Sequence, residues 1–180
     1  MNLMQYRPVP EVERAMELVN GKDTVKVLFV CLGNICRSPA AEGVMKATVK
    51  DDDGNRHWII DSAGTGDYHI GDLPDRRMRV HARERGLTLD HHCRQVSLSD
   101  FSDFDLIFGM DSRNVANLQR MAPDDASREK VLPIGVFLTP GTVSSYVPDP
   151  YYGGASDFEL VLDLLDDACR NLRDTVEGKS

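Results

Sequence analysis

The sequence predicts a doubly wound α/β domain, and two patterns indicate it. Short apolar segments, typical of strands buried in a parallel sheet, alternate with longer segments in which apolar residues recur at helical spacing. Such alternation over most of a chain is typical of a parallel sheet with helices on both faces. The length of 180 residues fits one domain of this kind.

The expected elements begin with a buried strand at Thr24–Val30 and a helix at Ser38–Lys50. The apolar face of this helix contains Ala41, Val44, Met45, Thr48 and Val49. The next expected elements are the strand Trp58–Asp61, a basic helix Asp75–Arg85 that Gly86 ends, the strand Phe104–Phe108, the helix Ser112–Met121 and the strand Lys130–Phe137.

The last expected helix begins at a capping box, Ser156-x-x-Glu159. Its apolar face contains Phe158, Val161, Leu162, Leu165, Ala168, Cys169 and Leu172. Residues 1–23 are interpreted as an N-terminal extension and residues 24–180 as the domain. Within the extension a short helix is predicted that packs on the domain; a docking peptide for a partner is the weaker alternative. Its apolar positions are Val12, Ala15, Met16 and Val19, with Gly21 after them.

The composition limits the function. A net charge of −8 argues against binding to nucleic acid or to an anionic membrane surface. Four cysteines without a dense framework indicate a reducing compartment. The N-terminus has no apolar segment long enough for a signal peptide or a membrane span. We therefore expect a cytoplasmic protein without membrane insertion.

The most informative segment joins the first strand to the first helix: Cys31-Leu32-Gly33-Asn34-Ile35-Cys36-Arg37-Ser38-Pro39. Gly33 and Asn34 are residue types that allow the tight backbone needed to turn successive N–H groups inward. Pro39 suits the start of a helix, whose N-terminus attracts anions, and Arg37 can bind two phosphate oxygens. A cysteine in such surroundings is expected to be a thiolate nucleophile next to a bound phosphate group.

Other interpretations of this segment are weaker. A buried structural cysteine does not require this order of Gly, Asn, Arg, Ser and Pro. The nucleotide loop G-x-x-x-x-G-K-[ST] is absent. The spacing from Cys31 to Cys36 is not C-x-x-C, so a thioredoxin-type pair or a zinc knuckle fits poorly.

The segment resembles the signature loop of the low-molecular-weight protein tyrosine phosphatases, V-C-x-G-N-x-C-R-S-P. Three further blocks resemble the family in the same order: Asp61-Ser62-Ala63-Gly64-Thr65, Gly109-Met110-Asp111 and Asp149-Pro150-Tyr151-Tyr152-Gly153. The resemblance covers roughly residues 24–178. It implies a four-stranded parallel sheet with the catalytic loop after the first strand, and a tyrosine-phosphorylated protein or peptide as the substrate.

The resemblance also implies roles. Cys31 would form a cysteinyl-phosphate, Ser38 would stabilise its thiolate, and Asp149, in a proline-flanked loop, would be the general acid. Arg37 would stabilise the transition state. The phosphate would be bound by Leu32, Gly33, Asn34, Ile35, Cys36 and Arg37. The residues expected to brace the loop are Asn34, Ser62, His91 and Asp111. No cofactor and no metal is implied.

The expected substrate pocket contains Tyr68, Tyr151 and Tyr152, whose rings could enclose an aromatic group. Cys36 would form a disulfide with oxidised Cys31 and protect it; a small filler residue is the alternative. Arg76, Arg77, Arg79, Arg83 and Arg85 are most simply a solvated helix face; a weaker hypothesis is that they attract anionic phosphoproteins to an otherwise acidic molecule. A tyrosine kinase is a further partner that the resemblance suggests.

Three rival functions share parts of this pattern. Arsenate reductases of this architecture carry a cysteine relay near the third core strand, where this chain has Leu106–Asp111 and no thiol. Protein arginine phosphatases carry threonine at the position of Ile35, and the larger Ile35 favours a phenyl ring. A non-catalytic phosphotyrosine-binding module is disfavoured because Cys31, Arg37 and Asp149 are all present.

Overall fold

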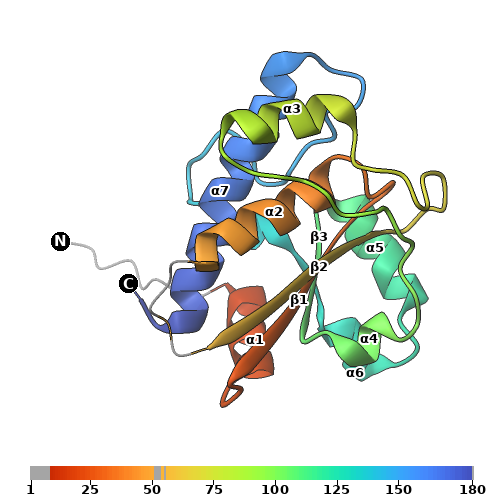
Figure 1. The fold of residues 1–180 in the computed structure, drawn as a ribbon. Coiled ribbons are helices and arrows are strands. Elements are labelled where there is room, and N and C mark those ends of the chain that lie inside the picture. The colour runs from red at the N-terminus through yellow and green to blue at the C-terminus, as the bar shows by residue number, and fades with distance from the viewer. Residues whose placement is uncertain (1–8, 51–53, 55, 180) are drawn as a thin grey trace.

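The sheet has four parallel strands in the spatial order β2-β1-β3-β4 (Figure 1). The computed structural model describes residues 9–50, 54 and 56–179. The strands are β1 (Thr24–Cys31), β2 (His57–Gly64), β3 (Leu106–Gly109) and β4 (Val131–Pro133). From β1 the chain continues to β2, which lies on one side of β1, and it later returns to β3, which lies on the other side of β1. Ligands bind at such a switch point, outside the carboxyl ends of the strands, and β1 ends there at Cys31.

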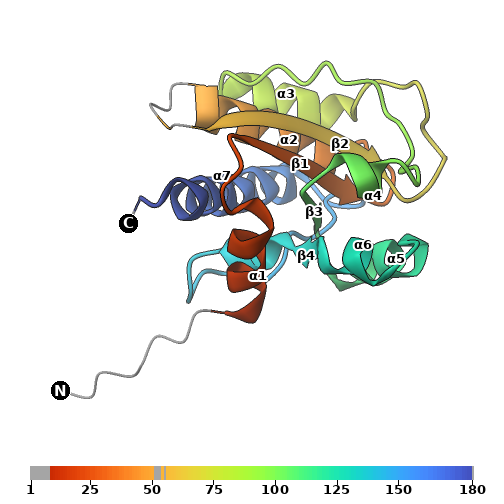
Figure 2. The same cartoon turned by 90° about the horizontal axis from the view of Figure 1, so that it is seen from below.

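Helices cover both faces of the sheet, which confirms the predicted doubly wound α/β architecture (Figure 2). One side carries α1 (Pro10–Val19), α2 (Arg37–Lys50), α3 (Arg76–Glu84) and α7 (Ala155–Glu177). The other side carries α4 (Asp100–Asp103), α5 (Ser112–Met121) and α6 (Asp125–Glu129). No helix in the described part of the chain is long and apolar enough to cross a membrane.

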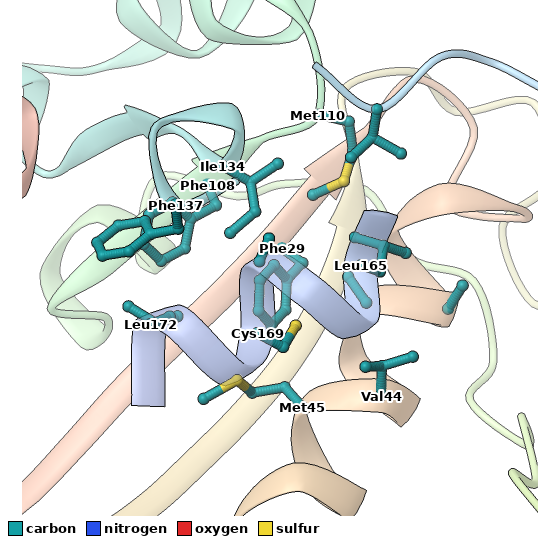
Figure 3. Packing of buried hydrophobic residues seen from close by; sticks show 14 of the residues in the cluster. Phe29, Val44, Met45, Phe108, Met110, Ile134, Phe137, Leu165, Cys169 and Leu172 are labelled. Carbon is teal, nitrogen blue, oxygen red and sulfur yellow. The ribbon is translucent and has the colours of Figure 1, made fainter. Parts of the chain in front are cut away.

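The larger core lies between the sheet and α7 (Figure 3). Phe29 of β1 stacks on Phe108 of β3 with ring centroids 5.8 Å apart, and Phe137 meets Phe108 edge-on at 5.8 Å. All seven residues predicted for the apolar face of the last helix are buried. This packing fixes the sheet behind the loop that follows β1.

The predicted strand Lys130–Phe137 is wrong in its second half. The strand ends at Pro133, and residues Ile134–Phe137 form a 3-10 helix, η1. Proline has no N–H for the ladder, and Pro133 already pairs with Gly109, the last residue of β3. The chain therefore turns where its partner strand ends.

The start of α7 also differs from the prediction. The helix begins at Ala155, and the Asp157 carboxylate accepts a 2.8 Å hydrogen bond from the N–H of Gly154. The predicted box Ser156-x-x-Glu159 is therefore wrong. Glu159 instead pairs with His81 and Arg85 of the α3 region.

Smaller differences concern the helix ends. Pro39 is the third residue of α2 rather than its first, a position whose N–H is also not needed by the helix. The short helices α4 and α6 had no sequence signal. Within the predicted extension, α1 buries Ala15 and Val19 against the domain; residues 1–8 lie outside the described part.

Candidate active site

The loop Cys31–Arg37 connects β1 to α2 and has the tight backbone that its sequence predicts. Asn34 is the only described non-glycine residue with a positive φ, 56°. The end of β2 passes directly beneath: a Cβ on Gly64 would lie 2.7 Å from the carbonyl oxygen of Leu32. Hydrogen bonds from Thr65 N to Cys31 O (3.0 Å) and Gly66 N to Leu32 O (2.9 Å) hold the two segments together. Glycine at position 64 is therefore required for the loop to keep its shape.

Beside the loop, Ser38 contacts the sulfur of Cys31. Ser38 Oγ lies 3.0 Å from Cys31 Sγ and accepts a 2.8 Å hydrogen bond from Asn34 Nδ2. Its single proton can then go to the sulfur or to the carbonyl of Ala63, which is further away at 3.3 Å. Asn34 Nδ2 also donates to Ser62 Oγ at 3.0 Å. The predicted residues Asn34, Ser38 and Ser62 thus form one buried network with Cys31.

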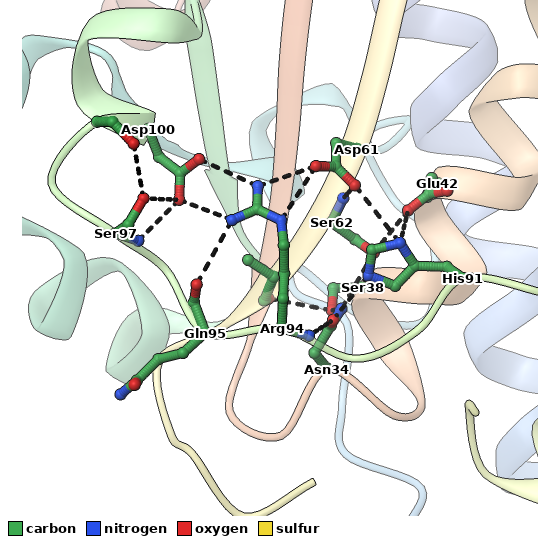
Figure 4. Close-up of polar contacts among 12 residues, drawn as sticks. Asn34, Ser38, Glu42, Asp61, Ser62, His91, Arg94, Gln95, Ser97 and Asp100 are labelled. Atoms are coloured by element: carbon green, nitrogen blue, oxygen red, sulfur yellow. Dashed lines mark hydrogen bonds and ion pairs between the residues drawn. The ribbon is translucent and has the colours of Figure 1, made fainter. Parts of the chain in front are cut away.

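Three more residues extend this network (Figure 4). The Asn34 amide oxygen accepts from the backbone N–H of Arg94 and lies 3.0 Å from His91 Nε2. The other His91 nitrogen lies 3.3 Å from Glu42 Oε1, and Ser62 donates to the same oxygen at 2.7 Å. His91 is where the resemblance suggested it would be, next to Asn34. Glu42 and Arg94 were not predicted, because on sequence alone they look like ordinary surface charges.

Arg37 is the cation of the site, and only 3% of its surface is exposed. Its Nη1 donates to Asp111 at 2.6 Å and to the carbonyl of Val147 at 3.1 Å, and its Nη2 lies 3.9 Å from the Asp149 carboxylate. Burial alone would lower the pKa of Arg37, but Cys31 and Asp111 raise it. The structure therefore brings Asp111 and Asp149 to the guanidinium despite their distance in sequence.

A cleft of about 330 Å³ opens over the loop. Its lining residues are Leu32, Gly33, Ile35, Cys36, Arg37, Tyr68, His69, Asp149, Tyr151 and Tyr152. All three predicted tyrosines are in this set. Tyr151 and Tyr152 contact each other edge-on, with centroids 4.9 Å apart. His69 was not predicted; it is the neighbour of Tyr68, and a Cβ on Gly33 would lie 3.2 Å from its ring.

The chain from residue 26 to residue 180 matches the family "Low molecular weight phosphotyrosine protein phosphatase". The chain belongs to this family. A curated relative with the same name, from Schizosaccharomyces pombe, is 46% identical over 144 residues, which cover 79% of this chain and 91% of the relative. The family match thus includes every predicted site residue.

Solved structures of family members have the same fold. The protein tyrosine phosphatase of Entamoeba histolytica, with Hepes in its active site, is 45% identical, with a TM-score of 0.81 over 86% of this chain and 97% of that one. The Drosophila arginine phosphatase DARP is 32% identical, with a TM-score of 0.75 over 83% and 96%. Because both substrates occur on this fold, the fold alone does not select between them.

The cysteines of this family member differ in their surroundings. All four are free and buried. Burial raises the pKa of the Cys36 thiol, and the nearby Asp75 carboxylate raises it further. Burial likewise raises the pKa of Cys93 to about 11, and Cys93 Sγ donates to the carbonyl of Asn34 at 2.8 Å. Cys36 and Cys93 are therefore thiols at neutral pH.

One set of side chains near the loop has the types that bind metals: Glu42, Asp61 and His91 lie within 4.8 Å of one another. Their charges already have partners. Lys46 pairs with Glu42 at 2.7 Å, and Arg94 pairs with Asp61 at 2.9 Å. A divalent cation here would face two fixed positive charges, so the set does not fit a metal.

Proposed function

We propose that this phosphatase hydrolyses phosphotyrosine in proteins or peptides through a cysteinyl-phosphate on Cys31. One observation carries the proposal. The backbone N–H groups from Gly33 to Arg37 donate no hydrogen bond to the described part of the protein, and Gly33, Ile35, Cys36 and Arg37 line the cleft. Unpaired donors in a tight loop, together with a buried guanidinium, fit the oxygens of a phosphate group.

In the first step the Cys31 thiolate attacks phosphorus and the bond from phosphorus to the tyrosine oxygen breaks. Arg37 and the loop N–H groups bind the three remaining oxygens, where negative charge develops. Asp149 donates a proton to the leaving oxygen, because an unprotonated phenolate is a poor leaving group. The half-exposed position of Asp149 at the cleft, 3.9 Å from Arg37, supports this role.

In the second step water attacks phosphorus, the bond from phosphorus to sulfur breaks, and Asp149 accepts the proton of the water. Cys31 leaves as a thiolate. A hydrogen bond from Ser38, whose oxygen is 3.0 Å from the sulfur, stabilises that charge. Asn34 favours donation from Ser38 to the sulfur, because the Asn34 amide itself donates to the Ser38 oxygen and occupies one of its lone pairs.

The cleft supports an aromatic substrate. Tyr68, Tyr151 and Tyr152 offer ring faces, and the apolar side chain of Ile35 lies at the cleft. Phosphoarginine remains the alternative substrate, since a family relative is named for it. For arsenate reduction the thiol relay is missing, because the described residues between Cys36 and Cys169 contain no cysteine other than Cys93.

The test is kcat/KM for a phosphotyrosine peptide and for a phosphoarginine peptide of the same sequence, with Cys31→Ser as the blank. We expect release of phosphate from both to depend on Cys31 and to favour tyrosine strongly. A preference for arginine would overturn the substrate but keep the cysteine chemistry. Binding of the phosphotyrosine peptide without turnover would instead support a binding module.

The proposal extends to regulation and location. Peroxide would convert Cys31 to a sulfenic acid; the Cys36 thiolate would then attack that sulfur and release hydroxide, forming a disulfide. Cys36 lines the cleft, and Cys31 in the same loop is near enough to contribute to the raised pKa of Cys36, which supports this pairing. A cytoplasmic location and a tyrosine kinase that supplies the substrate remain proposals.

A further inference from the structure

We propose that Arg77 is a positioning residue that joins the Cys31–Arg37 loop to the Asp149 loop, residues 147–153. Through this link it fixes the carboxyl group of Asp149 over the cleft. The inference rests on the proposed function, in which Asp149 is the proton donor. Arg77 belongs to the basic run on α3 that was interpreted from the sequence as a solvated face or, less simply, as a surface that attracts phosphoproteins.

The first half of the link connects Arg77 to the Cys31–Arg37 loop. The N–H of Asp75 donates to the carbonyl of Ile35 at 2.8 Å, which attaches the start of α3 to the loop. The Asp75 carboxylate caps α3 by accepting from Arg77 N at 2.8 Å. The same carboxylate accepts from Arg77 Nε at 3.2 Å and Nη2 at 3.1 Å, a bidentate pair.

The second half connects Arg77 to the proton donor. Arg77 Nη2 donates to the carbonyl of Tyr151 at 3.0 Å. The N–H of Tyr151 in turn donates to Asp149 Oδ1 at 3.1 Å. Asp149 Oδ2 then lies 3.9 Å from Arg37 Nη2. A continuous chain of polar contacts therefore runs from Ile35 in one loop to Asp149 in the other.

Two aromatic rings keep the guanidinium in this place. Its central carbon lies 5.4 Å from the centroid of Tyr151 and 4.7 Å from that of Phe158. Phe158 is buried in α7 and so provides a fixed surface. A planar guanidinium can stack and make directed hydrogen bonds at once, whereas a lysine ammonium cannot.

The chain offers a matched control on the same helix. Arg76 carries the same charge and is exposed, and its side chain makes no hydrogen bond or ion pair with the described residues. The side chain of Arg77 is itself 46% exposed, so its ion pair contributes little to stability. A loss of activity in a variant of Arg77 would therefore report geometry rather than unfolding.

The experiment compares Arg77→Met, Arg77→Lys, Arg76→Met and Asp149→Asn on two small substrates. Phenyl phosphate releases a phenoxide as basic as that of tyrosine, and this leaving group needs a proton; p-nitrophenyl phosphate releases the weakly basic nitrophenoxide, which needs a proton much less. We expect Arg77→Met to lower kcat/KM about tenfold on phenyl phosphate and less than about threefold on p-nitrophenyl phosphate. Arg77→Lys should lie between Arg77→Met and the parent, and Arg76→Met should match the parent.

Three outcomes would overturn the role of Arg77: an equal loss on both substrates, no loss on either, or the same loss in Arg76→Met. Thermal unfolding of each variant verifies that the compared proteins are folded. Asp149→Asn separates this inference from the proposed function. If Asp149→Asn lowers kcat/KM equally on both substrates, the assignment of the proton donor fails. If Asp149→Asn loses more on phenyl phosphate than on p-nitrophenyl phosphate and Arg77→Met does not, only the link through Arg77 fails.

Discussion

The buried carboxylate of Glu42 accepts a 2.7 Å hydrogen bond from the hydroxyl of Ser62. This contact determines the direction of the remaining bonds. Ser62 has one proton, so its oxygen must accept from Asn34. Asn34 then uses its second N–H for Ser38, which leaves the Ser38 proton for Cys31 or for the more distant carbonyl of Ala63. A charge on α2 thus orients the hydroxyl that stabilises the thiolate.

Replacement of Glu42 should therefore affect both stability and catalysis. In Glu42→Ala the Ser62 proton loses its charged acceptor, and the free energy of unfolding should fall by about 2–3 kcal/mol. The reoriented network should also lower kcat. Urea unfolding and steady-state kinetics measure the two effects.

Lys46→Ala is the matched control for Glu42→Ala. The Lys46 side chain is 55% exposed, so loss of its pair with Glu42 should change the stability by less than about 1 kcal/mol. Equal destabilisation in the two variants would mean that the contact with Ser62 is not what makes Glu42 important.

How much of this site the sequence predicts depends on the kind of residue. Cys31, Gly33, Asn34 and Arg37 have local reasons for their types, since one loop must bind an anion. Ser62, His91 and Asp149 were predicted only because blocks of sequence resemble a family. Glu42 had no signal, since a glutamate on a helix is usually solvated and only the tertiary fold buries it.

The fold shows the same division. Strands and helices with long apolar patterns, such as β1 and α7, were predicted to within a few residues. The 3-10 helix after Pro133 was missed because its apolar residues pack on the core as those of a strand would. Four residues, as in α4, are too few for a helical period to be recognised.

Ser38→Ala should slow the second chemical step more than the first. The variant loses the donor 3.0 Å from the leaving sulfur, which is needed when the bond from phosphorus to sulfur breaks. We expect kcat to fall about tenfold or more, with kcat/KM affected less. Rapid mixing with p-nitrophenyl phosphate should show a burst of one nitrophenol per enzyme; a linear time course would contradict this assignment.

Disulfide formation after peroxide treatment should become faster as the pH rises. Cys36 must attack as a thiolate. Its pKa is raised, mainly by burial and further by the nearby Asp75 carboxylate, so little thiolate exists at pH 7. Between pH 7 and 9 the rate should rise about tenfold per unit. Trapping with a thiol reagent and mass spectrometry measures it. Cys36→Ser should recover less activity on reduction; equal recovery would remove Cys36 from this role.

Cys93 should stabilise the fold as a hydrogen-bond donor to Asn34. The pKa of Cys93 is raised from 9.0 to about 11 in the folded protein, so this contribution is complete below 9 and is lost as the pH rises through about 11. Cys93→Ser keeps a donor that does not titrate in this range. The stability of the parent relative to Cys93→Ser should thus be constant from pH 6 to 8 and decline above 9. A constant difference up to pH 10.5 would contradict the role of the thiol.

Ile35→Thr should shift the substrate preference away from phosphotyrosine. Ile35 is half-buried at the cleft, and a Cβ on Gly33 would lie 3.6 Å from its side chain. Threonine replaces an apolar branch with a hydroxyl, which packs less well against a phenyl ring and can accept from a guanidinium.

We expect the ratio of kcat/KM for phosphotyrosine over phosphoarginine peptides to fall about tenfold in Ile35→Thr, as for other small changes in an apolar pocket. Ile35→Val, which shortens the side chain without a hydroxyl, is the control and should change the ratio much less. Should both variants lower the two rates in parallel, residue 35 shapes the loop but does not select the substrate, and selection would lie with the tyrosines at the rim.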